Sequence, residues 1–255
     1  WAPDAYDAAA SPVAMFLSSV AKLAGIAALF RIVFLTHPHL PAMGTALGII
    51  AVLTMSYGNF VAFRQKSVKR LFAYSSIAQA GYIILGMLGL AQSAPQAILY
   101  YSVIYLLMNL ALFMVTIELE QTTQDPLITS FAGLHQRAPL MALTLMVVLF
   151  SLAGVPPMAG FFGKWLLFSS AVEAGYTTLV VLAILNSVVS LFYYLFLVKA
   201  AYYGNPNEKF PKLISRPVPT YAAMVISLAI LLLGAYPQPL VEYLTSLNLP
   251  VTLLP

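Results

Sequence analysis

The sequence contains no cysteine and very few charged residues, and both absences restrict what the chain can be. Of its 255 residues, 61% are hydrophobic and only 8% are charged, whereas soluble domains carry about 25% charged residues. A chain so poor in charge cannot cover a water-exposed surface, which excludes a soluble globular protein. Without cysteine, the chain itself can form no disulfide, thiolate metal site or thiolate-bound iron–sulfur cluster.

Motifs for bond chemistry and for nucleic-acid binding are also missing. The sequence has no GxGxxG, no Walker loop and no group of nucleophile and base, so it indicates no covalent catalysis. The net charge of +4 is small and confined to particular loops, which argues against a nucleic-acid partner. We likewise predict no metal site.

Long apolar runs fill most of the sequence instead. A helix needs about 20 apolar residues to cross the hydrocarbon core of a membrane, and charges, prolines and polar runs divide the chain at about that spacing. We therefore predict an all-α, multi-pass integral membrane protein with a single transmembrane domain over residues 1–255. The predicted spans are 12–36, 43–63, 71–91, 96–117, 139–174, 177–199 and 218–236.

The fifth span, 139–174, is too long for one straight helix. Near its middle it contains Gly154, Pro156, Pro157 and Gly160, and proline removes a backbone hydrogen bond and clashes with the preceding turn. We expect two half-helices joined by an unwound stretch near 154–160. Such a stretch frees carbonyl and amide groups, which in a membrane must line a cavity or find partners within the protein.

The loop charges predict the orientation. The connections 64–70 and 199–216 hold eight lysines and arginines between them, and Arg137 lies in the connection 118–138. By the positive-inside rule these three connections face the cytoplasm, or the matrix or stroma of an organelle. Residues 1–11 are then inside and the C-terminus is outside.

Three basic residues fall outside these connections: Lys22, Arg31 and Lys164. Arg31 lies near the outer end of its span, within snorkelling reach of the surface. Lys22 lies about 15 Å into the same span at 1.5 Å per residue. A charge at the bilayer centre costs about 2.5–3.5 kcal/mol even on lenient scales. Such a cost usually persists because the residue is functional; the alternative for Lys22 is an ion-paired or hydrogen-bonded lysine that only locks helices together.

Lys164 follows the unwound stretch directly. Half-helix ends at the membrane midplane are a recurring device for holding ions and substrates. A lysine kept away from water there can exist both charged and neutral, which a proton relay requires. The alternative is a simple kink with the lysine facing a lipid-filled gap.

Polar residues on neighbouring spans are spaced to form a path between the two lysines. Ser75 and Gln79 lie four residues apart on the third span, and Tyr105 and Asn109 have the same spacing on the fourth, so each pair shares a helix face. The sixth span adds Asn186, Ser187 and Ser190. We predict that Ser75, Gln79, Tyr105 and Asn109 line a hydrated channel. The alternative is that they only hydrogen-bond helices to each other.

Three stretches carry a family resemblance: "WAPDAYDAAASPVAMFLSSVAKLAGIAALFR", "KRLFAYSSIAQAGYIILG" and "SLAGVPPMAGFFGKWLLF". In this order they resemble subunit N, also called subunit 2, of respiratory complex I. This is the proton-translocating NADH–quinone oxidoreductase, and the resemblance extends to its cyanobacterial and plastid relatives. The broader antiporter-like superfamily, which includes Mrp Na⁺/H⁺ antiporter subunits, shares the proline–glycine break followed by a lysine.

The resemblance implies a fold and a role. It implies that the chain corresponds to the second half of a 14-helix subunit, and that Lys22 and Lys164 are proton-relay residues. It further implies that the chain binds no cofactor and works among other membrane subunits of a complex I-like assembly, in a bacterial inner membrane, a thylakoid or another energy-transducing membrane. Partner subunits would carry flavin or iron–sulfur clusters, with quinone as the substrate of the complex.

Two other functions remain alternatives. One is an Mrp-type cation/proton antiporter subunit, which has no redox partner. The other is a purely structural membrane subunit, in which Lys22 and Lys164 only pair with acidic residues.

Overall fold

The computed structural model describes residues 1–36, 41–89, 94–123, 127–204 and 216–246. This part of the chain is built from helices, which confirms the predicted all-α fold class. The α-helices are α1 Ala2–Ala8, α2 Ser11–Phe16, α3 Lys22–Thr36, α4 Pro41–Ala62, α5 Val68–Met87, α6 Ala94–Thr123, α7 Leu134–Arg137, α8 Pro139–Ala153, α9 Ala159–Glu173, α10 Thr177–Tyr203, α11 Pro217–Ala235 and α12 Gln238–Ser246. A π-helical turn, Leu17–Ala21, and a 3₁₀ turn, Ile128–Phe131, complete the set.

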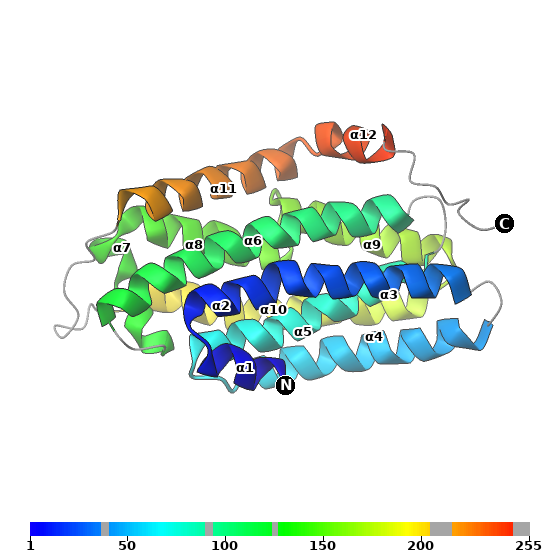
Figure 1. The fold of residues 1–255 in the computed structure, drawn as a ribbon, viewed down its shortest axis with the longest axis horizontal. Coiled ribbons are helices and arrows are strands. Elements are labelled where there is room, and N and C mark those ends of the chain that lie inside the picture. The colour runs from blue at the N-terminus through cyan, green and yellow to red at the C-terminus, as the bar shows by residue number, and fades with distance from the viewer. Residues whose placement is uncertain (37–40, 90–93, 124–126, 205–215, 247–255) are drawn as a thin grey trace.

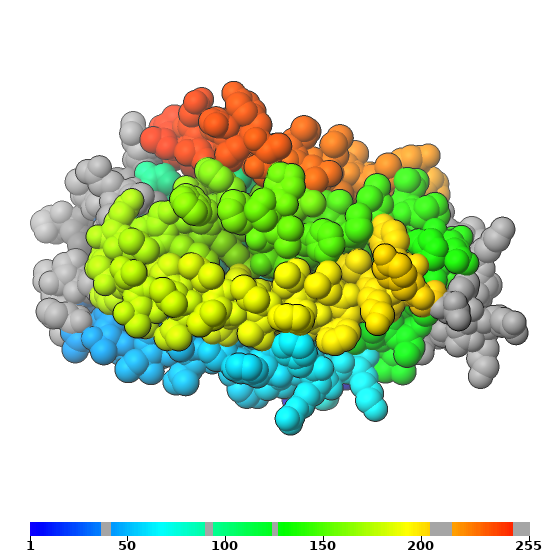
Figure 2. Space-filling model, turned by 180° about the vertical axis from the view of Figure 1, so that it is seen from behind, coloured from blue at the N-terminus to red at the C-terminus, as the bar shows by residue number. Residues whose placement is uncertain are grey.

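The long helices run side by side along the long axis of the molecule (Figure 1). Helices α11 and α12 lie along one edge and α4 lies along the opposite edge, with α5 and α6 between them. From behind, α10 crosses the middle of the molecular surface, between α4 on one side and α8 and α9 on the other (Figure 2).

Helix α5 is the buried centre of this bundle, and small residues allow its neighbour α4 to approach closely. A Cβ atom added at Gly81 would lie 2.8 Å from the carbonyl oxygen of Ala51, and one at Gly58 would lie 2.6 Å from the amide nitrogen of Ala78. Contacts between small residues of this kind drive helix packing where the surrounding medium is itself apolar.

The distribution of apolar residues is that of a membrane bundle. Five helical segments in the described residues are both long and apolar enough to span a bilayer: Ser11–Thr36, Ala42–Ala62, Ala94–Thr123, Thr177–Tyr203 and Pro217–Ala235. Helix α5 is long enough but too polar to be among them. It tolerates its polar side chains because other helices surround it, whereas α4, α10 and α11 expose rows of large apolar side chains.

Two helices extend beyond their predicted ends, one because a side chain caps it and one because a charged residue in it forms an ion pair. Helix α5 begins at Val68 rather than at 71, since the Ser67 hydroxyl caps it by accepting a hydrogen bond from the amide of Arg70 at 3.4 Å. Helix α6 continues to Thr123 rather than ending at 117. Its Glu120 forms an ion pair of 3.1 Å with Lys69, so a charge that we expected to mark the end of the span is satisfied within the helix.

The first span contains a feature that the sequence analysis did not predict. The segment from Ser11 to Thr36 is continuous, but its backbone widens into the π-helical turn Leu17–Ala21 immediately before Lys22. Turns of this type insert one extra residue and are frequent at functional sites. The turn thus sets the direction in which the Lys22 side chain leaves the helix.

The basic connections gather at one end of the bundle. The amide of Ile128 donates to the carbonyl of Lys66 at 3.0 Å, and the amide of Gly133 donates to that of Ala200 at 3.2 Å. At the same end, Arg70 pairs with Asp4 and Asp7 of α1. Of the connection 199–216, residues 205–215 lie outside the described part of the chain.

Candidate functional site

The predicted break between the two half-helices is confirmed. Helix α8 ends at Ala153, Gly154 adopts a left-handed conformation with φ of 85°, and α9 begins at Ala159. The Pro156–Pro157 bond is cis. The amide of Gly160 donates a hydrogen bond across the break to the hydroxyl of Ser151 at 3.0 Å.

Lys164 points from α9 back toward the end of α8. Its Nζ donates to the carbonyl oxygens of Leu152 at 2.9 Å and Ala153 at 3.2 Å, and to the hydroxyl of Ser187 on α10 at 2.7 Å. An ammonium group has three N–H donors, so each has an acceptor. Carbonyls at a helix C-terminus also carry partial negative charge, which compensates a cation without any carboxylate.

The surroundings of Lys164 exclude a lipid-facing kink. The residue is only 4% exposed, and the ring centroid of Tyr82 lies 4.6 Å from its Nζ, within range of a cation–π interaction. Between residues that the structure describes, ion pairs join Lys69 to Glu120 and Arg70 to Asp4 and Asp7. Among the described residues neither Lys164 nor Lys22 is paired with an acid, and both are hydrogen-bonded to neutral groups.

Gln79 and Ser75 belong to the same polar cluster as Lys164. The amide nitrogen of Gln79 donates to the carbonyl of Leu152 at 3.1 Å, which is one of the acceptors of Lys164. It also donates to the hydroxyl of Tyr194 at 3.4 Å, and that hydroxyl forms a hydrogen bond with the hydroxyl of Ser75. The structure therefore joins these two predicted residues to the lysine through buried partners.

Lys22 occupies a different setting. Its Nζ donates to both the carbonyl and the hydroxyl oxygens of Ser76 and lies 5.5 Å from the ring centroid of Tyr105. The lysine borders an open hollow of about 410 Å³ between the first span and α5. Lys22 is thus accessible from outside the bundle, whereas Lys164 is enclosed.

The remaining predicted residue does not join either cluster. The side-chain amide of Asn109 donates to the carbonyl of Tyr105 at 2.8 Å, one turn back on its own helix. In the described residues, hydrogen bonds connect Lys164 with Gln79 and Ser75, and Lys22 with Ser76, but none joins the two sets. Ser75 thus belongs to the cluster of Lys164, whereas the adjacent Ser76 binds Lys22.

The sequence analysis missed Asn59 and the tyrosines around it. Asn59 is fully buried on α4; its amide nitrogen donates to the Tyr82 hydroxyl at 3.1 Å and to the Asn186 carbonyl at 3.0 Å. Its amide oxygen accepts from the Tyr193 hydroxyl at 3.1 Å. The signal was available, because Asn59 is a lone amide near the end of an apolar span. The tyrosines gave no comparable signal among so many aromatic residues.

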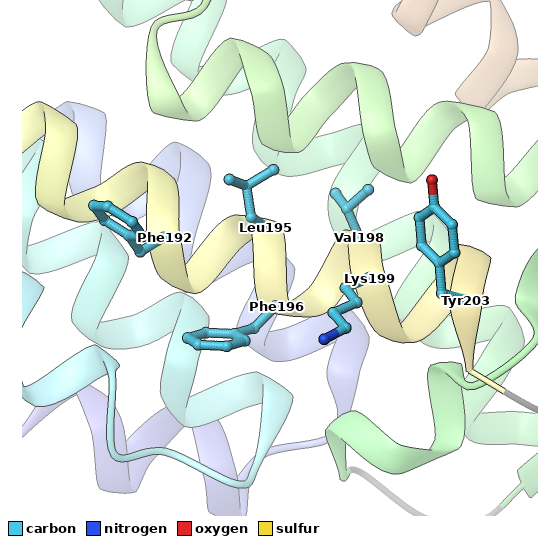
Figure 3. Close-up of a pocket in the computed structure, with 6 residues that line it drawn as sticks. All are labelled: Phe192, Leu195, Phe196, Val198, Lys199 and Tyr203. Carbon is cyan, nitrogen blue, oxygen red and sulfur yellow. The ribbon is translucent and has the colours of Figure 1, made fainter.

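A groove on the outer face of α10 lies apart from both lysines (Figure 3). It measures about 430 Å³ and is lined by Phe192, Leu195, Phe196, Val198, Lys199 and Tyr203. Its lining is almost entirely apolar, so the polar clusters around the two lysines, and not this groove, form the candidate site.

Sequence comparisons place the chain among respiratory membrane proteins. Residues 1–190 match the family model described as NADH:quinone oxidoreductase/Mrp antiporter, TM. NADH-quinone oxidoreductase subunit N of Moorella thermoacetica is 44% identical over 254 residues, which are 99% of this chain and 53% of the relative. F(420)H(2) dehydrogenase subunit N of Methanosarcina mazei is 41% identical, over 95% of this chain and 51% of its own. The chain spans about half the length of these curated relatives.

Solved structures show the same half-length similarity. A chain of respiratory complex I from Thermus thermophilus is 34% identical with a TM-score of 0.85, covering 96% of this chain and 54% of its own. A chain of the archaeal membrane-bound sulfane sulfur reductase is 29% identical with a TM-score of 0.87, covering 97% and 50%. The resemblance to subunit N is confirmed: the chain is an integral membrane protein that belongs to the NADH:quinone oxidoreductase/Mrp antiporter transmembrane family.

Proposed function

We propose that this chain is the proton-translocating part of a non-redox membrane subunit in a complex of the NADH–quinone oxidoreductase type, and that Lys164 and Lys22 carry the protons. One observation supports this proposal above all: Lys164 is buried at a helix break, and its hydrogen-bond partners among the described residues are all neutral acceptors. A lysine paired with a carboxylate would leave an unpaired buried anion whenever it lost its proton, at high cost. A lysine held by carbonyls and a hydroxyl leaves no such charge.

The proposed coupling is electrostatic. A charge that changes at a neighbouring site alters the relative free energies of charged and neutral Lys164, because no carboxylate among the described residues compensates the lysine and the low-dielectric interior screens little. Binding of a proton here and the charge state of the neighbour are then linked reciprocally. Lys22, which borders an open hollow, would exchange charge with groups outside this bundle.

Electron transfer in this proposal belongs to partner subunits. The chain has no cysteine to hold an iron–sulfur cluster, so flavin or clusters would lie elsewhere in the complex, as would quinone reduction. Relatives named for NADH, for F(420)H(2) and for sulfane sulfur all match this same half-length region, which supports a role separate from the redox chemistry. The exposed apolar faces of α4, α10 and α11 would contact lipid and neighbouring membrane subunits of a bacterial inner membrane or another energy-transducing membrane.

The decisive experiment is Lys164→Ala in the full-length subunit, assayed in inverted membrane vesicles for proton pumping, electron transfer to quinone and amount of assembled complex. We expect normal assembly and a loss of pumping. Lys199→Ala, which removes an exposed lysine on α10, is the matched control and should pump normally.

Two other results would replace the proposal. A sodium-dependent pH gradient formed without electron donor or quinone would indicate a cation/proton antiporter. Activity that simply follows the amount of assembled complex in Lys164→Ala would indicate a structural residue.

A further inference from the structure

The three partners of Lys164 differ in what they can do chemically. The carbonyls of Leu152 and Ala153 can only accept hydrogen bonds, whereas the hydroxyl of Ser187 can accept or donate. Charged Lys164 needs three acceptors, and all three groups serve. Neutral Lys164 has two N–H donors and one lone pair, and a lone pair facing a carbonyl oxygen is repelled. Of these partners only Ser187 can reverse its role and donate to that lone pair.

We propose that Ser187 is the residue through which Lys164 exchanges its proton, an inference that rests on the relay function proposed for Lys164. In the releasing step, an N–H bond of the ammonium breaks and the proton joins the Ser187 oxygen. The proton that Ser187 already carried passes at the same time to a water molecule. Lys164 ends neutral, Ser187 ends as a neutral hydroxyl that donates to Nζ, and hydronium carries the charge away. The reverse sequence loads the lysine.

The position of Ser187 fits this role. Leu152 and Ala153 are buried, only 2% and 5% exposed, so their carbonyls lie deep inside the cage. Ser187 is partly exposed and sits on α10 between the buried residue Asn186 and the exposed Val188. It is therefore the partner of Lys164 that lies nearest the outer face of the described helices.

A second hydroxyl lies beside this exchange point. The hydroxyl of Tyr82 also interacts with Ser187 and accepts a hydrogen bond from the Asn59 amide at 3.1 Å, while its ring lies against the Lys164 Nζ. Tyr82 therefore holds both the lysine and the serine in place. In the described structure Gln79 shares the Leu152 acceptor but makes no hydrogen bond to Nζ, so it positions the cage rather than exchanging the proton.

The test compares Ser187→Ala with Ser187→Thr in the full-length subunit within the assembled complex. Alanine removes the hydroxyl. Threonine keeps it at a position that is partly exposed. Ser227→Ala is the matched control, since its hydroxyl bonds only the Ala223 carbonyl of its own helix, at 2.9 Å. The rate of proton translocation per assembled complex and its solvent deuterium isotope effect are measured in inverted vesicles.

We expect Ser187→Ala to lower proton translocation at least about 10-fold. The loss should be smaller than the roughly 100-fold or greater effect of a positioned proton-transfer group, because water replaces the hydroxyl in part. The residual rate should show a larger isotope effect than wild type, since proton transfer then limits it. Ser187→Thr should restore both values, and Ser227→Ala should leave them unchanged.

The outcomes separate this inference from the proposed function. If Ser187→Ala pumps normally while Lys164→Ala does not, Ser187 is not the exchange partner and the relay function of the lysine stands. If threonine fails to rescue, or if the isotope effect stays at the wild-type value, Ser187 has a packing role and the inference is overturned. If Lys164→Ala also pumps normally, both proposals fall together.

Discussion

Asn59 is the residue on which most of the buried hydrogen bonds between α4, α5 and α10 converge. Its single side chain binds the hydroxyls of Tyr82 and Tyr193 and the backbone of Asn186. Because Tyr82 also lies against Lys164, the amide supports the lysine cage from a distance. A polar side chain in the interior is stabilising only when all of its partners are satisfied, and Asn59 meets that condition.

We predict that Asn59→Ala destabilises the subunit. It removes the hydrogen bonds that Asn59 makes with the hydroxyls of Tyr82 and Tyr193, at a cost of about 0.5–1.5 kcal/mol for each bond. Thermal unfolding of the solubilised complex, followed by loss of assembled subunit, measures the effect. Asn109→Ala is the control, since that amide only bonds a carbonyl of its own helix. Equal unfolding temperatures for the two variants would show that the Asn59 contacts add no stability.

At the residue scale, the sequence revealed the groups that are chemically out of place but not their partners. Lys22 and Lys164 stood out because a charge in an apolar span is costly, and Asn59 could have been recognised by the same argument. That Gln79 and Lys164 share one carbonyl, or that Asn109 turns back on its own helix, depends on how helices pack. Spacing along a single helix contains no information about that packing.

At the scale of elements, the break between α8 and α9 places the C-terminal carbonyls of α8 next to the side chain of Lys164. Gly154 ends α8 with a left-handed residue, which glycine adopts without steric cost. The chain then restarts as α9 at an angle that brings Lys164 back onto the last carbonyls of α8. The break was predictable because proline and glycine act locally on the backbone. The π-helical turn before Lys22 has no such signature in the sequence and was not predictable.

We predict that Gly154→Ala impairs proton translocation and not only stability. The new Cβ would lie 3.1 Å from Cδ of Lys164 and 3.6 Å from its Nζ, so the lysine must move within its cage. Alanine at φ of 85° also costs about 1–2 kcal/mol of backbone strain. Pumping per assembled complex and thermal stability are the measurements.

Gly175→Ala separates the two effects of Gly154→Ala. Gly175 has nearly the same backbone conformation, with φ of 88°, but a Cβ there meets no atom within 4 Å. It should lose similar stability and keep full pumping. If both variants pumped equally well, displacement of Lys164 by the added methyl group would have no functional consequence.

At the scale of the whole molecule, polarity is arranged in reverse to that of a soluble protein. Large apolar side chains cover α4, α10 and α11 on the outside, while α5 carries buried serine, glutamine and tyrosine at the centre. The polar cluster around Lys164 is therefore surrounded by helices, and charge is concentrated where the connections meet at one end (Figure 1). This segregation could be predicted from composition and hydropathy, because the medium around the spans decides which residues can face it.

The loop charges predict how the chain is oriented in the membrane. Because this chain contains no cysteine, single introduced cysteines can test that orientation. Lys66 and Ala174 are exposed in the α4–α5 and α9–α10 connections, which lie at opposite ends of the bundle (Figure 1). Single cysteines at these positions therefore report opposite sides of the membrane. In a full-length subunit freed of other cysteines, Lys66→Cys should react with a membrane-impermeant maleimide in inside-out vesicles. Ala174→Cys should react only in right-side-out vesicles, because positively charged connections stay on the inner side. The reverse labelling pattern would show that the chain has the opposite orientation in the membrane. Protons released from Lys164 would then leave toward the opposite compartment.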